Sequence, residues 1–142
     1  HYQDAESWYK RSLAEKRNAP VLNALASVYI KQGKYHKAYG ILKRLRKETP
    51  ASADVWNNSG AVFVHFNKTQ DAIRSFQTAI DLAVYDATAY YNLALLYFRE
   101  GNLVSAQEMA RKAIERDPLL PQLQDLVKKI EKKMTKSETF NE

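Results

Sequence analysis

The sequence predicts an all-α fold made of tandem helix pairs, and three observations lead to this prediction. The chain has 142 residues, about the size of one domain, and a hydrophobic content of 45% that is ordinary for a folded protein. Glycine and proline are scarce, at four each, which suits helices joined by short links. Small and large apolar residues also recur in register over three segments of equal length: 19–52, 53–86 and 87–120.

The three segments align without gaps, and each predicts two antiparallel helices. Their fourth, seventh, eighth and eleventh positions fall on one stripe of a first helix, and their twentieth, twenty-fourth and twenty-seventh positions on a stripe of a second. Large residues stand at the fourth and eleventh positions, and small residues at the eighth and twentieth. The fourth position holds Leu22, Trp56 and Tyr90, and the eleventh holds Tyr29, Phe63 and Tyr97. The eighth holds Ala26, Gly60 and Ala94, and the twentieth holds Ala38, Ala72 and Ala106.

The links between helices carry their own signals. Gly33, Asn67 and Gly101 share the fifteenth position and tolerate the left-handed conformation that ends a helix. Asp86 and Thr69 are predicted to cap the helices that follow them. The predicted helices are 2–17, 20–32, 35–47, 53–66, 69–83, 87–100, 103–116 and 121–135.

This pattern resembles the tetratricopeptide repeat (TPR) family over residues 19–120. Ser59, Ala110 and Val84 depart from the family pattern at single positions. The resemblance implies a right-handed superhelix in which the first helix of each pair lines a concave groove.

Degenerate copies of the repeat extend the predicted domain over residues 1–135. Residues 1–18 match the second helix of a preceding repeat, which indicates a fragment of a longer array. Residues 121–135 have apolar residues on one face and lysines on the other, as expected of a capping helix. We expect the tail, 136–142, to be flexible.

Enzymatic, metal-binding and membrane-spanning classes find no support in the sequence. The chain has no cysteine, and its three histidines, His1, His36 and His65, stand apart. There is no glycine-rich phosphate loop, no apolar run long enough to span a bilayer and no hydrophobic signal segment. We therefore expect a cytoplasmic, non-enzymatic protein without cofactor or small-molecule substrate. We expect no glycosylation at the sequons that begin at Asn57 and Asn67.

Two rows of residues on the first helices are predicted to face the groove and to bind a partner. Asn58 and Asn92 share the sixth position, and a carboxamide can both donate to and accept from a peptide unit of an extended chain. Lys31, His65 and Arg99 share the thirteenth position and would favour an acidic ligand. Asn57, Tyr91 and Leu95 complete the predicted set.

One TPR subclass binds the acidic tails of heat-shock chaperones through a carboxylate clamp. The clamp would need a lysine where this chain has Asn23 and an asparagine where it has Ser27. It would need an asparagine at position 58, where Asn58 stands, a lysine in place of Thr88 and an arginine in place of Asn92. Only Asn58 matches, so this activity is disfavoured.

The sequence thus predicts a scaffold that binds an extended or helical segment of another protein, and two alternatives remain. One is self-assembly through an apolar patch of Tyr2, Ala5, Trp8, Tyr9 and Leu13. The other is contact with nucleic acid or an anionic membrane, because residues 1–52 have an excess of seven positive charges, with a cluster at 43–47.

Overall fold

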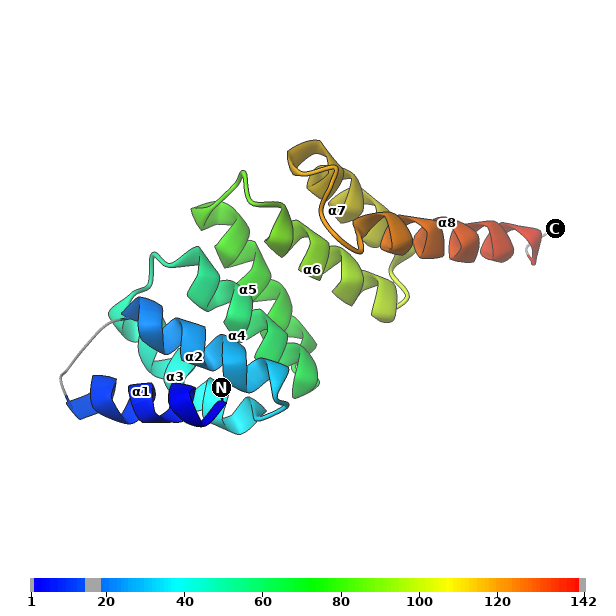
Figure 1. Cartoon of the computed structure of the whole chain (residues 1–142). Coiled ribbons are helices and arrows are strands. Elements are labelled where there is room, and N and C mark those ends of the chain that lie inside the picture. The colour runs from blue at the N-terminus through cyan, green and yellow to red at the C-terminus, as the bar shows by residue number, and fades with distance from the viewer. Residues whose placement is uncertain (1, 15–18, 141–142) are drawn as a thin grey trace. The chain divides into compact units, whose positions relative to one another are not determined.

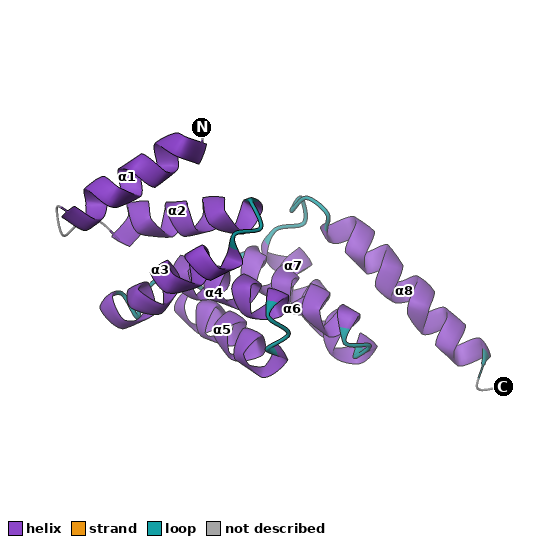
Figure 2. Cartoon of the chain, turned by 90° about the horizontal axis from the view of Figure 1, so that it is seen from below, coloured by secondary structure: helices purple, strands orange, loops and turns teal. Residues whose placement is uncertain are grey.

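The computed structural model describes residues 2–14 and 19–140, and this part of the chain contains eight helices and no strand (Figures 1 and 2). The predicted all-α fold class is therefore confirmed. The helices are α1 (Tyr2–Ala14), α2 (Ala19–Lys31), α3 (Tyr35–Glu48), α4 (Ala53–His65), α5 (Thr69–Leu82), α6 (Ala87–Arg99), α7 (Leu103–Arg116) and α8 (Leu123–Thr139).

The helices form two compact units, 1–82 and 83–142, where the sequence predicts a single domain. In the first unit α2 packs on α3, α4 packs on both α3 and α5, and α1 packs on α2. In the second unit α6 packs on α7, and α8 packs on both. The predicted stripes face the interior in both units: Phe63 is buried, and Trp56 and Tyr97 are half-buried.

In the α4–α5 pair, the eighth and twenty-fourth positions of the repeat lie in tight contact. A Cβ atom built on Gly60 of α4 would stand 2.4 Å from the ring of Phe76 on α5, far inside van der Waals contact. In the α2–α3 pair the same positions hold the fully buried Ala26 and Leu42. In the α6–α7 pair they hold Ala94 and Ala110. The largest residue thus faces the smallest, and close packing requires this match of sizes.

The three helix-pair turns have one conformation, as the sequence predicts. Gly33, Asn67 and Gly101 have φ angles of 73°, 57° and 78°. Each residue donates its N–H to the carbonyl three residues back, and the next N–H reaches back five residues, as from Lys34 to Tyr29 at 2.8 Å. These two bonds satisfy carbonyls that the helix end leaves open.

The caps agree with the prediction only in part. Asp86 caps α6 as predicted, because its Oδ1 accepts the N–H of Thr88 at 2.9 Å. The prediction for Thr69 is wrong: the turn at Asn67 leads directly into α5, so Thr69 is already its first helical residue. Ser52 and Asn102 cap α4 and α7 without having been predicted.

The ends of the described helices also differ from the prediction. Gln122 has a left-handed φ of 70°, which delays the start of α8 to Leu123. That helix then runs to Thr139, so residues 136–139 are helical and not part of a tail. The predicted end of the first helix, at residue 17, lies outside the described residues.

The side chain of Arg46 on α3 points towards aromatic rings and not outward with the rest of the predicted basic cluster. Its guanidinium lies 5.2 Å from the ring centre of Phe63, 5.7 Å from that of Tyr39 and 5.9 Å from that of Trp56. Cations are attracted to ring faces at such distances. The neighbouring Leu45 is fully buried. The exposed basic residues of the run 43–47 are therefore only Lys43, Arg44 and Lys47.

Arg116, the last residue of α7, connects this helix to the link before α6. Its Nε donates to the carbonyl of Val84 at 2.6 Å, and its Nη1 donates to that of Lys112 at 2.9 Å. The guanidinium also stacks 4.0 Å from the ring centre of Tyr90. One side chain therefore joins the link before α6 to the end of α7.

Replacing Gly60 with alanine tests the match of sizes in the α4–α5 pair. We expect Gly60→Ala to lower the free energy of unfolding by about 1–3 kcal/mol, because the new methyl group overlaps the Phe76 ring. Combining it with Phe76→Leu reproduces the alanine and leucine of the α2–α3 pair. In urea unfolding, the double variant should be less destabilised than the sum of the two single variants; strict additivity would contradict the argument.

Candidate functional site

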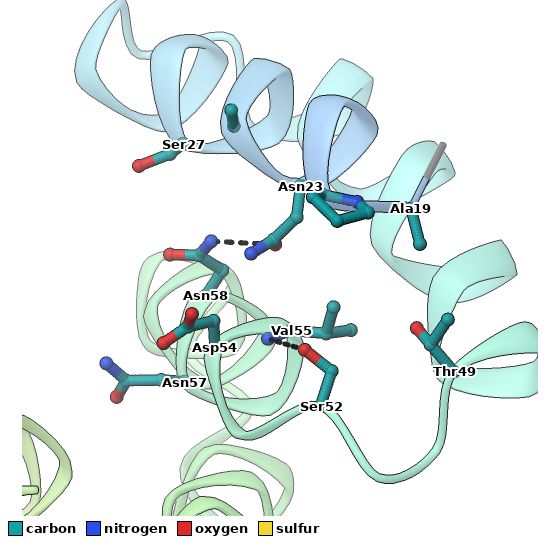
Figure 3. Close-up of a pocket in the computed structure, with 11 residues that line it drawn as sticks. Ala19, Asn23, Ser27, Thr49, Ser52, Asp54, Val55, Asn57 and Asn58 are labelled. Atoms are coloured by element: carbon teal, nitrogen blue, oxygen red, sulfur yellow. Dashed lines mark hydrogen bonds between the residues drawn. The ribbon is translucent and has the colours of Figure 1, made fainter. Parts of the chain in front are cut away.

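A cavity of about 550 Å³ opens between the first helices α2 and α4 (Figure 3). Both helices and the link between α3 and α4 contribute to its lining. We call it the α2–α4 groove. It is lined by Ala19, Pro20, Asn23, Ala24 and Ser27 of α2, Thr49 and Ser52 of the link, and Asp54, Val55, Asn57 and Asn58 of α4.

Two asparagine side chains meet inside the α2–α4 groove. Nδ2 of Asn58 donates to Oδ1 of Asn23 at 2.9 Å, and this bond joins α4 to α2 (Figure 3). A carboxamide has two N–H donors and an oxygen with two lone pairs, so the bond uses only part of the capacity of each side chain. The pair can therefore hold its geometry and still offer hydrogen bonds to a peptide unit.

The α2–α4 groove is polar but carries little charge. Among the described residues that line it there is no lysine, arginine or histidine, and Asp54 is the one ionisable side chain. The hydroxyl of Ser52 accepts the N–H of Val55, and that of Thr49 donates to the carbonyl of Leu45, so both are used by the fold. The amides of Asn23 and Asn58 and the Ser27 hydroxyl are the groups best suited to main-chain recognition.

A second cavity, also of about 550 Å³, lies between α6 and α8 in the second unit. We call it the α6–α8 groove. Tyr91 of α6 donates its hydroxyl hydrogen to Oε1 of Gln122 at 3.2 Å, just before α8 begins. The capping helix thus supplies one wall of a groove. Its lining is Tyr91, Leu95, Phe98 and Arg99 of α6 with Gln122, Asp125, Leu126 and Lys129.

The α6–α8 groove combines cations with aromatic rings. Nζ of Lys129 lies 2.8 Å from Oδ2 of Asp125, and the hydrogen bond and negative charge of that carboxylate raise the pKa of Lys129. Nζ of Lys133 lies 5.1 Å from the ring centre of Phe98. Arg99 is exposed at the end of α6. The groove is therefore suited to an acidic group with an apolar neighbour.

Five of the eight predicted binding residues line these grooves. Asn57 and Asn58 lie in the α2–α4 groove, and Tyr91, Leu95 and Arg99 lie in the α6–α8 groove. The other three, Lys31, His65 and Asn92, line neither. His65 instead stacks on Tyr35 of α3, with ring centres 3.6 Å apart and planes at 10°.

Several lining residues are absent from the predicted set. Asn23 stands at the fifth position of its segment, next to the predicted row at the sixth, and its partner in α4 shows only in three dimensions. Gln122, Asp125 and Lys129 belong to the capping helix, which the sequence predicts to be a solvated end. A search for amides beside the sixth position would have found Asn23; no repeat signal points to the other three.

The described residues form neither a metal-binding cluster nor a membrane-spanning helix. Within them, no three histidine, aspartate or glutamate side chains come close enough together to hold a metal ion. No helix in the described ranges combines the length and apolar character needed to cross a bilayer.

Comparison with family models gives two matches that together span residues 1–121. Residues 1–79, more than half of the chain, match the model described as "Anaphase-promoting complex, cyclosome, subunit 3". Residues 62–121 match a model described as "Tetratricopeptide repeat".

Among curated proteins, the chain is 24% identical over 119 residues to the human protein O-mannosyl-transferase TMTC1. The match covers 84% of this chain but only 14% of that protein.

Solved TPR structures are similar over most of the chain. The first TPR domain of Spaghetti (RPAP3), bound to the HSP90 peptide SRMEEVD, has a TM-score of 0.75 at 21% identity, covering 82% of this chain and 93% of that one. The Sgt2 TPR domain of Aspergillus fumigatus scores 0.80 at 17% identity, covering 87% and 83%. MamA scores 0.78 at 26% identity, covering 96% and 75%.

Proposed function

The chain belongs to the tetratricopeptide repeat family and, over residues 1–79, to the family described as subunit 3 of the anaphase-promoting complex, and we propose that it is a protein-interaction scaffold. In this proposal an extended segment of a partner protein binds in the α2–α4 groove of the first unit. TPR domains commonly bind peptides, and the RPAP3 domain was solved with one. We propose no enzymatic role, cofactor or small-molecule substrate.

The observation that carries the proposal is the asparagine pair in the α2–α4 groove. An extended chain exposes an N–H and a carbonyl at every residue, and the amides of Asn23 and Asn58 can bond to both kinds of group. Each such bond contributes about 0.5–1.5 kcal/mol net. Recognition of the main chain would let this groove accept many sequences, so side-chain specificity must come from elsewhere.

The α6–α8 groove of the second unit is a separate candidate site, which we propose recognises side chains. Arg99 and Lys129 line this groove together with Leu95 and Phe98, and Lys133 lies over the ring of Phe98. A partner side chain that carries a carboxylate would gain electrostatic attraction there, and an adjacent apolar residue would bury against the rings. The sequence predicts an acidic preference from Lys31, His65 and Arg99. We keep that preference but propose that Arg99 and two lysines of α8 produce it.

The first experiment tests use of the α2–α4 groove. Peptides of about ten residues, selected on the protein from a random phage-displayed library, are titrated into ¹⁵N-labelled protein. We expect shifts at Asn23, Ser27 and Asn58, and about tenfold weaker binding by Asn23→Ala/Asn58→Ala, which removes both partners and leaves neither amide unpaired.

Gln77→Ala is the matched control, because it removes an exposed amide from the second helix α5. Its affinity for the selected peptides should equal that of the wild type. Equal affinity of the double asparagine variant would refute use of this groove, as would shifts confined to α3 and α5.

A second prediction concerns the heat-shock peptide SRMEEVD, seen bound to the RPAP3 domain. The α2–α4 groove presents Asn23 and Ser27 where the carboxylate clamp would need lysine and asparagine, and none of the described residues that line it is a cation. We therefore expect a dissociation constant weaker than about 1 mM in fluorescence polarisation with this peptide. Micromolar binding would show that another set of residues replaces the clamp.

The alternative function is self-assembly within a larger TPR complex, and Trp8 favours it. This side chain is 62% exposed on α1, while Ala5 of the same helix packs against the core. The side chains of Tyr2, Tyr9 and Leu13 lie outside the described part of the chain.

Sedimentation equilibrium tests this alternative. If α1 mediates association, the wild-type protein should form oligomers at high concentration, and Trp8→Glu should be monomeric under the same conditions. A monomeric wild-type protein would end the idea for residues 1–142.

A further inference from the structure

The outward face of α3 has a gap in its middle. Gly40 is exposed, and a Cβ atom built on it would have no other atom within 4 Å. Its φ is not in the positive range, so neither helix geometry nor packing requires a glycine. Glycine costs a helix more conformational entropy than any other residue, so a glycine here needs another explanation.

Basic side chains surround this gap. His36, Lys43 and Lys47 stand at i−4, i+3 and i+7 from Gly40, so all lie on the same exposed face. Lys37 and Arg44, at i−3 and i+4, flank it and pair with Glu6 and Glu48. None of the ion pairs seen among residues 2–14 and 19–140 involves Lys43 or Lys47. We call Gly40 with these five residues the α3 notch.

The α3 notch is not a general feature of the repeat. The position of Gly40 is taken by Arg74 on α5 and by Glu108 on α7, and both long side chains are exposed. The positions of Lys43 and Lys47 hold Gln77 and Asp81 on α5, then Arg111 and Glu115 on α7. The missing side chain and a lysine at both of the other two positions therefore occur together on α3 alone among these three helices.

We propose that the α3 notch docks an acidic α-helix of a partner protein, which crosses α3 at Gly40. The distance between packed helices is set by the side chains at their contact, so a glycine lets the second backbone approach closely. Carboxylates three or four residues apart on that helix would then face Lys43 and Lys47. A polyanion such as nucleic acid or a lipid surface would touch only the long cationic side chains and would gain nothing from the gap.

This inference is independent of the proposed function. None of the six residues of the α3 notch lines the α2–α4 groove, so one partner segment can bind there while a second docks on α3. The alternative of contact with nucleic acid or an anionic membrane becomes an outcome of the test below.

The probe is an alanine-based helical peptide of about 18 residues with glutamates along one face, titrated into ¹⁵N-labelled full-length protein. We expect saturable shifts confined to residues 36–47. Gly40→Leu should weaken binding at least about fivefold while raising the melting temperature by about 4 °C, because leucine favours the helix and meets open space. A loss of binding in a more stable protein cannot be a folding defect.

Matched variants complete the design. Lys43→Gln/Lys47→Gln should also weaken binding, and Arg74→Leu, at the equivalent position of α5, should not. A peptide with glutamine in place of each glutamate should not bind. Unchanged affinity in Gly40→Leu would overturn the proposal. So would shifts in the α2–α4 groove, or tighter binding of single-stranded RNA or phosphatidylserine vesicles that Gly40→Leu leaves intact.

Discussion

The close approach of the two helices within each pair is the constraint on which the rest of the structure depends. A small residue on the first helix must face a residue of complementary size on the second, as Gly60 faces Phe76. This contact fixes the rotation of both helices about their axes, because a turn of either would drive the ring into backbone. Once the rotation is fixed, Asn58 must project away from α5, on the side of α4 that faces the groove. The α2–α4 groove is thus a consequence of core packing.

Most of the fold could be predicted from the sequence because the repeat supplies the same information three times. The left-handed residues are a good example: Gly33, Asn67 and Gly101 were found by their shared position, and each ends its helix with the same two hydrogen bonds. Helix ends were harder to predict. Thr69 is a residue type that often caps helices, but it already lies inside α5. The start of α8 is later than predicted because Gln122 has a left-handed conformation, which glutamine does not favour.

The candidate site could be predicted only where it follows the repeat. Asn58 stands in a recurrent position, and it lines a groove. Asn23 became visible only through its bond across to α4, and Lys129 only through the placement of α8 against α6. His65 shows the opposite limit, because its stacking on Tyr35 depends on a residue from another helix. Sequence position gives the face of a helix, but not which neighbour a long or aromatic side chain chooses there.

The three contacts of Arg116 have a consequence for how the second unit opens. The link before α6 and the last turn of α7 are far apart in sequence, yet one guanidinium holds both. Neither segment can fray alone without breaking the bond to Val84 or the stacking on Tyr90, so both belong to one cooperative opening event. Lysine would keep the charge, but it lacks the planar fork that donates in two directions while lying on a ring.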